Sequence, residues 1–356
     1  MTAGMPGAHP AAPRAERLLD LRRPDEALAL LGPALAERPD DAALLTSAAY
    51  AWLLKGDDGQ AATMARRASA ADPHDDRALR IQASALLHLG DAHQAAGLAY
   101  RAVQLAPHAH ITHLLYARCL GRIPGAHEQA WAEAMRTVEL APNDPSAHVL
   151  VAELAYPAEN VVNPYALDIA EDALQHALRL DPQNSTAMND LARVRLRRSR
   201  RIGAMSGFSD ALTADPHNET ALHNTGVVLG GFLRPAHWMI LGATVVSLMV
   251  QGPGSGAAGR ILQGGLALGV VGVVAWVVVR VRRAVPRRSR VFLREFARHN
   301  GWAVAWAGCL ALAVLLLLAG PVLPEAARAT AVGLALVSVT GGVLCSWVWV
   351  ASRRRR

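Results

Sequence analysis

Prolines recur along the N-terminal part of this 356-residue chain at a nearly constant interval. They follow segments that end in forms such as AADP, QLAP and RLDP, and consecutive members are 34, 34, 35, 40 and 34 residues apart. The set is Pro39, Pro73, Pro107, Pro142, Pro182 and Pro216. Because proline has no amide N–H and crowds the preceding turn, each one is expected to end a helix. Such a fixed period indicates stacked structural repeats rather than one compact core.

Small residues recur in the same register. If each proline is position 32 of a repeat, then positions 8, 20 and 27 hold alanine at 16 of 17 sites, the exception being Thr137. The alanines are Ala49, Ala83, Ala117, Ala152 and Ala192 at position 8, Ala27, Ala61, Ala95, Ala130, Ala170 and Ala204 at position 20, and Ala34, Ala68, Ala102, Ala177 and Ala211 at position 27. Small side chains let helices approach closely, so each repeat is expected to be a pair of helices, A and B, stacked on the next pair. Turn glycines at Gly56, Gly90 and Gly125 separate the two helices.

With this period and register, the chain resembles the tetratricopeptide-repeat (TPR) family over residues 12–232. The resemblance implies an all-α solenoid of about six helical hairpins plus a final helix A, and a protein that binds a protein or peptide partner. Residues 1–11 are expected to be disordered. The later repeats depart from the pattern, because His113, His148 and Arg195 replace bulky apolar residues and an insertion within 156–165 lengthens one hairpin turn.

After Arg234 the composition changes to long apolar runs. Four segments are expected to form a C-terminal transmembrane helical region, since a helix needs about 20 apolar residues to cross the hydrocarbon core. They are residues 236–251, 261–279, 302–319 and 329–351, followed by a basic tail at 352–356. The first segment is short and ends at a Gly-Pro pair, so whether it spans fully stays open. We interpret the segment cores as free of ionisable side chains, which argues against transport.

Charge is distributed unevenly between these two parts. The whole chain carries +7 with a pI near 10.0. From Pro235 onward there are 14 arginines against two glutamates, a net of +12, which leaves 22 basic and 27 acidic residues before it, a net of −5. Arginine-rich connectors stay cytoplasmic by the positive-inside rule. We therefore expect residues 280–301 and the tail on the cytoplasmic side of a plasma membrane. Because four spans return the chain to the side where it began, the TPR array and both termini are expected there too.

The bilayer is thus an expected partner, and nucleic acid is not. The stretch 286–299 pairs Phe292 with Phe296 among arginines, which fits either an amphipathic helix on the inner leaflet or a plain connector. The only lysine is Lys55 in an arginine-rich and alanine-rich chain, a bias typical of a GC-rich bacterial genome.

No motif for chemistry stands out. The GxGxxG at 254–259 follows no strand and is discarded as a dinucleotide turn. Three cysteines, Cys119, Cys309 and Cys345, make no disulfide or metal framework. His108, His110 and His113 are close in sequence; we interpret them as polar residues of solvated turns, with metal binding left open. No catalytic residue, cofactor or metal is expected, and the chain is not expected to be an enzyme.

The TPR resemblance does imply a binding surface, because peptide-binding members contact ligands through helix A positions 2, 5, 9, 12 and 13. The candidate partner-binding residues are Arg77, Arg80, Ser84, His88, Arg118, Asn189, Arg193, Leu196 and Arg197. Arginine binds carboxylates through paired hydrogen bonds, which favours an acidic peptide. The Lys and Asn pattern of the family's carboxylate clamp is not reproduced, and a solvated face without a ligand is an equally good interpretation of any one arginine.

Two functions follow as hypotheses. In the first, the chain is a membrane-anchored protein interaction scaffold that recruits a cytoplasmic partner through its TPR groove. In the alternative, it is a regulatory TPR subunit whose active unit is the C-terminal helical bundle.

Overall fold

The computed structural model describes residues 9–155, 164–215, 218–250, 256–284, 297–298 and 300–354. All regular secondary structure in these ranges is α-helical, which confirms the all-α prediction. The chain divides into two compact units, a first unit of Met1–Pro182 and a second unit of Gln183–Arg356. The two units are described separately.

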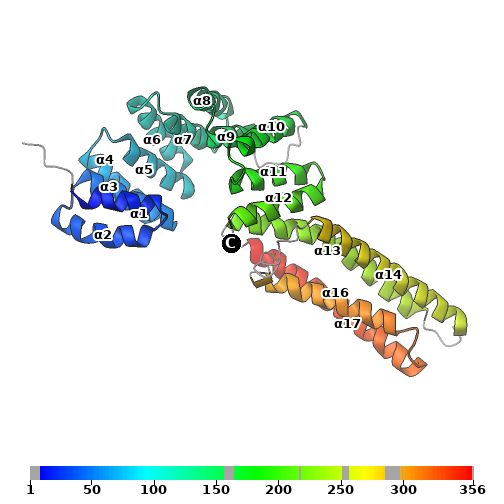
Figure 1. Ribbon diagram of the computed structural model, residues 1–356. Helices are drawn as coiled ribbons and strands as arrows, with labels where there is room; N and C mark the ends of the chain where they lie inside the picture. Colours follow the sequence, from blue (N-terminus) through cyan, green and yellow to red (C-terminus); the bar gives the residue numbers. More distant parts are fainter. Residues whose placement is uncertain are drawn as a thin grey trace, which may run out of the picture. The chain divides into compact units, whose positions relative to one another are not determined.

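The first unit is a stack of five helical hairpins (Figure 1). Its helices are α1 (Ala11–Asp20), α2 (Pro24–Glu37), α3 (Ala42–Lys55), α4 (Asp58–Ala71), α5 (Asp76–His88), α6 (Ala92–Leu105), α7 (His110–Leu120), α8 (His127–Leu140), α9 (Pro145–Ala155) and α10 (Pro164–Leu180). Odd-numbered helices are the expected helices A, and even-numbered helices are the helices B. Each helix packs on the next in sequence, as the repeat register predicts.

The helix boundaries follow from local chemistry. Each helix B ends two residues before its repeat's proline, as expected from proline's missing N–H. Helices α3, α4, α5, α6, α11 and α13 each begin with a side chain that accepts a hydrogen bond from a first-turn N–H, a cap worth about 1 kcal/mol. The caps are Asp41, Asp57, Asp75, Asp91, Asn184 and Asn218. Asp75 also accepts a bond from the Thr46 hydroxyl at 2.8 Å and so links α5 to α3.

The turns between helix A and helix B need a left-handed residue at position 15. Gly56, Gly90 and Gly125 have φ of 77°, 90° and 84° there. The non-glycine residues Arg22 and Ser199 take the same position with φ of 58°. A side chain in this region is strained, because its Cβ crowds the backbone. The sequence identified the three glycines but not these two strained residues.

The alanine register is the core of the array. All 17 sites at positions 8, 20 and 27 are at most 4% exposed, Thr137 included. The largest values among them are those of Ala34 and Ala152. The burial of these small side chains agrees with the close helix packing that the register predicts, since well-packed interiors leave no room for larger ones.

The second unit begins with one more hairpin and continues into four long helices. Its helices are α11 (Ser185–Arg197), α12 (Arg201–Ala214), α13 (Glu219–Met249), α14 (Gly256–Ala284), α16 (Gly301–Ala319) and α17 (Glu325–Arg354). Four of the described helices are long and apolar enough to cross a membrane, within Glu219–Met249, Ala257–Trp276, Gly301–Ala319 and Ala327–Val348. The buried side chains of Ile240, Trp306, Leu310 and Val339 form their common core with the end of α12.

The junction between the repeats and the apolar region differs from the sequence expectation. A boundary near residues 232–236 was expected, but α13 runs through it without a break and contains Pro235. The final helix A and the first apolar segment are therefore one helix of 31 residues. Proline leaves the carbonyl four residues earlier, that of Gly231, without its helical donor. Arg201 Nη1 donates to this carbonyl at 3.2 Å, which satisfies it and helps the helix continue.

Two ionisable side chains of the described apolar helices are buried, and both lie at the edges of the expected segments, His237 at the start of 236–251 and Arg328 just before 329–351. His237 is 4% exposed and its Nδ1 accepts a hydrogen bond from Trp306 Nε1 at 3.2 Å. Arg328 is 8% exposed and donates to the Leu323 carbonyl at 3.2 Å. Helix α13 begins at Glu219 and so places His237 mid-helix, where α16 and α17 cover it.

Several expectations lie outside the described residues. These are most of the disordered N-terminus at 1–11, most of the insertion at 156–165, the start of the 254–259 motif and nearly all of the 286–299 stretch. Helix α1 begins at Ala11, inside the first of these ranges.

Candidate partner-binding face

The helices A of the first unit form one continuous layer. Helix α1 contacts α3, α3 contacts α5, α5 contacts α7, and α7 contacts α9, whereas comparable contacts between successive helices B are not found in the described residues. Closer spacing within the A layer than within the B layer curves the stack with the A layer inside. We call the exposed side of this layer the helix A face.

Arg77 joins three successive helices of this face. Its guanidinium forms an ion pair with Glu16 of α1 and lies over the ring of Tyr50 of α3, 5.6 Å from the ring centre. The side chains of Arg77 and Glu16 are 36% and 44% exposed. Arg77 is thus on the predicted face and within reach of solvent, but it already has a carboxylate and an aromatic partner.

The other two arginines of this set also have carboxylate partners. Arg80 pairs with Asp76 of its own helix at 2.9 Å, and Arg118 of α7 pairs with Glu153 of α9 at 3.1 Å. About a third of each side chain of the Arg118–Glu153 pair is exposed. An acidic ligand on this face would therefore have to replace the carboxylate that already pairs with each arginine, rather than bind an unpaired guanidinium.

Ser84 and His88 complete the predicted set in α5. Ser84 is partly buried, and His88 is exposed with its Nδ1 2.9 Å from the Asp58 carboxylate of α4. His88 therefore pairs with a helix B, at the end of its own helix, rather than with another helix A.

The remaining candidates, Asn189, Arg193, Leu196 and Arg197, lie on α11 in the second unit. Asn189 is only 3% exposed; its oxygen accepts a bond from Asn224 of α13 at 3.0 Å, and its amide donates to Asp190. Arg193 pairs with the same Asp190 at 3.1 Å, while Arg197 is exposed. In this group the asparagine joins two helices, and the arginines lie nearer to solvent.

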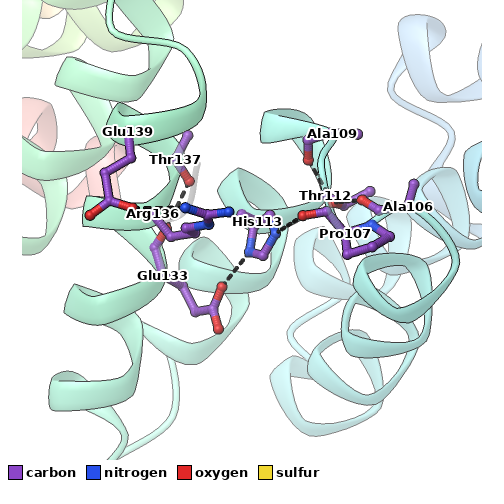
Figure 2. A network of polar contacts seen from close by, with 9 residues as sticks. All are labelled: Ala106, Pro107, Ala109, Thr112, His113, Glu133, Arg136, Thr137 and Glu139. Carbon is purple, nitrogen blue, oxygen red and sulfur yellow. Dashed lines mark hydrogen bonds and ion pairs between the residues drawn. The ribbon is translucent and has the colours of Figure 1, made fainter.

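A polar network around His113 was not anticipated. Figure 2 shows the imidazole between two helices, with Nε2 2.9 Å from the Pro107 carbonyl and Nδ1 2.6 Å from the Glu133 carboxylate of α8. Next to it, the buried Thr112 hydroxyl donates to the carbonyl of Ala109 at 2.7 Å. Thr137 donates to the Glu133 carbonyl at 2.9 Å. The network ties the start of α7 to its preceding turn and to α8.

The same arrangement recurs one repeat later. His148 occupies the position of His113, and its Nε2 lies 2.8 Å from the Pro142 carbonyl. Its ring lies 4.2 Å from that of His176 in α10, and this neighbouring imidazole lowers the pKa of His176 below its ordinary value. The sequence signal for this bond is a histidine six residues after the proline that ends the preceding repeat. From sequence alone, His113 and His148 are interpreted only as departures from the repeat pattern.

The histidines near the Pro107 turn do not converge. His110 lies 2.9 Å from Asp144, whereas His113 contacts Glu133. Among the residues that the structure describes, no group of three or more histidine, cysteine, aspartate or glutamate side chains could hold a metal ion. His113 is 7% exposed and lies in α7, so the interpretation of these histidines as residues of solvated turns is wrong for His113.

Cys119 is a buried side chain of α7 without access to solvent. Burial raises the pKa of its thiol to about 12, and the nearby Arg118 guanidinium opposes this shift only in part. Reactive cysteines depend on the thiolate form, so this residue acts as a small apolar group of the core.

Similar solved structures are helical repeat proteins. A chain of the APC/C hetero-tetramer Cut9–Hcn1 has a TM-score of 0.51 at 13% identity, over 78% of this chain and 49% of that one. PilW, a widely conserved type IV pilus biogenesis factor, has a TM-score of 0.49 at 15% identity, over 62% of this chain and 96% of its own. YrrB, a TPR protein with an unusual peptide-binding site, has a TM-score of 0.35 at 18% identity, over 54% of this chain and 96% of its own. No family model and no curated protein matches the sequence.

The stacked hairpins place the chain in the class of helical-repeat solenoids, to which four apolar helices are added. The 34-residue period, the buried alanine register and the proline-ended helices B are those of a tetratricopeptide-repeat fold.

Proposed function

We propose that the protein is a membrane-anchored interaction scaffold. Its TPR array captures a cytoplasmic protein or peptide, and its four apolar helices hold the array at a bacterial plasma membrane. The observation that carries the proposal is α13, in which the last helix A of the array continues directly into the first apolar helix. A continuous helix couples the two parts more stiffly than a flexible linker would.

The arginine distribution supports an orientation. Eight arginines lie between residues 280 and 301, between the second and third apolar helices, and four end the chain at 353–356. The shorter connectors at 252–260 and 320–328 hold one arginine each. Under the positive-inside rule, the connector 280–301 and the tail 353–356 are cytoplasmic. Four spans then put both termini and the TPR array on the same side.

The proposed ligand is an acidic peptide segment of the partner. Arg77, Arg80 and Arg118 supply planar guanidinium donors on neighbouring helices of the helix A face, with Ser84 and His88 at the side. On α11, Asn189, Arg193 and Arg197 make a second candidate group. Their present carboxylate partners show that these positions accommodate a carboxylate at hydrogen-bonding distance.

Orientation is tested with reporters fused to each terminus of the full chain, read out in intact cells. Both reporters are expected on the cytoplasmic side, because four spans return the chain to the side where it began. A reporter at either terminus found outside would contradict the four-span arrangement.

The helix A face is tested by crosslinking in membranes and quantifying the partners recovered with variants of one ion pair. Arg118→Gln should weaken recovery about tenfold, because it removes a charge-assisted contact on a partly exposed side chain. Glu153→Gln should strengthen recovery, since it removes the internal competitor for Arg118. Arg136→Gln, on helix B in a pair with Glu139, is the matched control and should change nothing. Equal recovery from the first two variants would exclude this face as the acidic-peptide site.

One observation favours the alternative, in which the bundle is the active unit and the TPR array regulates it. His237 is buried among the apolar helices, and its Nε2 has no hydrogen-bond partner in the described part of the chain. Ionisable residues within membrane helices are often functional. If His237→Phe abolishes the cellular function while partner recovery and folding stay intact, the alternative replaces the scaffold.

A further inference from the structure

The second unit contains a cavity of about 500 Å³ where α12, α13 and α14 meet. This lies within the range of about 300 to 1,000 Å³ that is usual for small-molecule sites. Its wall includes the first residues of α12, the middle of α13 and the second half of α14. None of the candidate partner-binding residues lines it, so the proposed partner binding does not use this cavity.

One end of the cavity is cationic. Arg200 and Arg201 line it together with Ser199, Ile202 and Gly203. Residues 201–203 are the first three of α12, and first-turn N–H groups have no acceptor within their own helix. Two guanidinium groups beside a helix N-terminus favour an anion with several oxygen atoms, such as a phosphate.

The other end is apolar. Met239 of α13 with Val273 and Trp276 of α14 line it. Met239 is 49% and Trp276 55% exposed, so these large apolar side chains face outward from the unit. Both helices are among the four that are long and apolar enough to cross a membrane.

Gly231 and Pro235 of α13 shape the middle of the cavity. Gly231 leaves room because it has no side chain, and a Cβ built there would lie 3.8 Å from Arg201 Cζ. Pro235 frees the Gly231 carbonyl, which accepts a bond from Arg201 Nη1 and so fixes this guanidinium at the wall. The other donors of that guanidinium are oriented by this contact, which is the preorganisation that a specific site needs.

We infer that this cavity binds one anionic phospholipid, with its phosphate at Arg200 and Arg201 and an acyl chain along Met239, Val273 and Trp276. The inference rests on the proposed function, because it takes α13 and α14 to span the membrane. The cationic end then lies at the cytoplasmic surface, where anionic headgroups gather, and the apolar end lies in the hydrocarbon. A tryptophan such as Trp276 near the boundary suits the interfacial position of indole.

The test uses the full-length protein in nanodiscs made of mixed phosphatidylglycerol and phosphatidylcholine. Lipids that stay bound after release into detergent are counted by native mass spectrometry. The wild type should retain one phosphatidylglycerol in preference to phosphatidylcholine by about tenfold or more, because both lipids carry the phosphate but the choline cation of phosphatidylcholine is repelled by the two arginines.

Three variants distinguish binding in this cavity from non-specific attraction of anionic lipid to the basic protein. Gly231→Leu fills the cavity and leaves every charge in place, and Arg200→Gln with Arg201→Gln removes the cationic end. Each should lower the retained phosphatidylglycerol about tenfold or more. Arg260→Gln, at the other end of α14, is the matched control and should leave retention unchanged. Helicity is measured for all variants. If the arginine variant unfolds α13, its lipid retention is not interpreted, and the comparison of Gly231→Leu with the wild type tests the inference.

Equal retention of the two lipids by the wild type, or unchanged retention in a folded Gly231→Leu variant, would overturn the inference. Displacement of the retained lipid by inorganic phosphate alone would also overturn it, because the site would then recognise phosphate without the acyl chain. Membrane fractionation of the cells that express the protein, before its extraction, separates the two proposals. Protein absent from the membrane refutes the proposed function, whereas membrane-bound protein without lipid preference refutes only this inference.

Discussion

Arg201 donates a hydrogen bond from Nη1 to the carbonyl of Gly231 at 3.2 Å, across 30 residues of sequence. This carbonyl is the one that Pro235 leaves without a helical donor, since proline has no N–H. A side chain of α12 thus completes the backbone hydrogen bonding of α13 at the point where the repeat array becomes the apolar region.

A double-mutant cycle should detect this relationship. Arg201→Ala is expected to lower the stability of the second unit by about 1 kcal/mol, the usual value of one hydrogen bond. In a Pro235→Ala background the helix supplies its own donor, so the same substitution should cost much less. Thermal unfolding of the four proteins in detergent, followed by circular dichroism, provides the measurement. Additive effects would contradict the proposed role of Arg201.

Gly342 of α17 is expected to be intolerant of a large side chain. A Cβ at this position would lie 3.2 Å from Trp306 and 3.6 Å from His237, two residues joined by a hydrogen bond in the bundle core. Gly342→Leu should therefore lower the melting temperature in detergent by an amount corresponding to about 1 to 3 kcal/mol, as overpacking does. Gly333→Leu on the same helix is the control, because nothing lies within 4 Å of its Cβ. Equal losses in the two variants would argue against tight packing at Gly342.

The first unit should fold by itself. A fragment of residues 1–182 ends at the observed unit boundary and is expected to be soluble and strongly helical, because each hairpin packs on its neighbours. A fragment of residues 1–232 ends inside α13 and exposes Leu222 and Leu229, which pack against the bundle core in the full chain. It should be less soluble. Circular dichroism and size-exclusion chromatography compare the two, and a mostly unfolded shorter fragment would contradict the unit assignment.

Arg22 has an unfavourable backbone conformation that glycine would relieve. Its φ of 58° matches the 77° of Gly56 at the same turn position. Arg22→Gly in the 1–182 fragment should raise the free energy of unfolding by about 1 kcal/mol, the left-handed penalty reduced by glycine's larger unfolded-state entropy. The reciprocal Gly56→Ala should lower it by a similar amount. Denaturant titrations measure both, and a destabilising Arg22→Gly would show that the arginine side chain contributes more than its strain costs.

The buried thiol of Cys119 predicts a pH dependence of stability. Burial raises its pKa in the native state to about 12, against 9.0 for a solvated thiol. Below the lower value both states hold the proton, so stability does not change. Above it the unfolded state loses the proton while the native state keeps it, so stability falls as pH rises. The difference in free energy of unfolding between the wild-type 1–182 fragment and its Cys119→Ala variant should fall by about 1 kcal/mol between roughly pH 8 and pH 10. A constant difference would mean that the native thiol ionises normally.

The repeat architecture could be predicted from sequence because its determinants are local or periodic. Prolines end the helices B, aspartates and asparagines cap helix starts, and the alanines at three repeat positions are all buried as expected. The number of apolar helices was also readable, since length and hydropathy along one segment decide it. The candidate arginines were placed on the correct helices by the same register.

Only the tertiary structure decided what those side chains contact. Arg77 pairs with Glu16, 61 residues earlier, and Arg118 with Glu153, 35 residues later. Trp306 meets His237 across 69 residues. Side chains this far apart in sequence meet only when helices from different segments are placed side by side, and repeat spacing does not specify which rotamers then come within hydrogen-bonding distance. For the same reason α13 continues through Pro235: the group that satisfies the Gly231 carbonyl belongs to another helix, so no local rule could have predicted it.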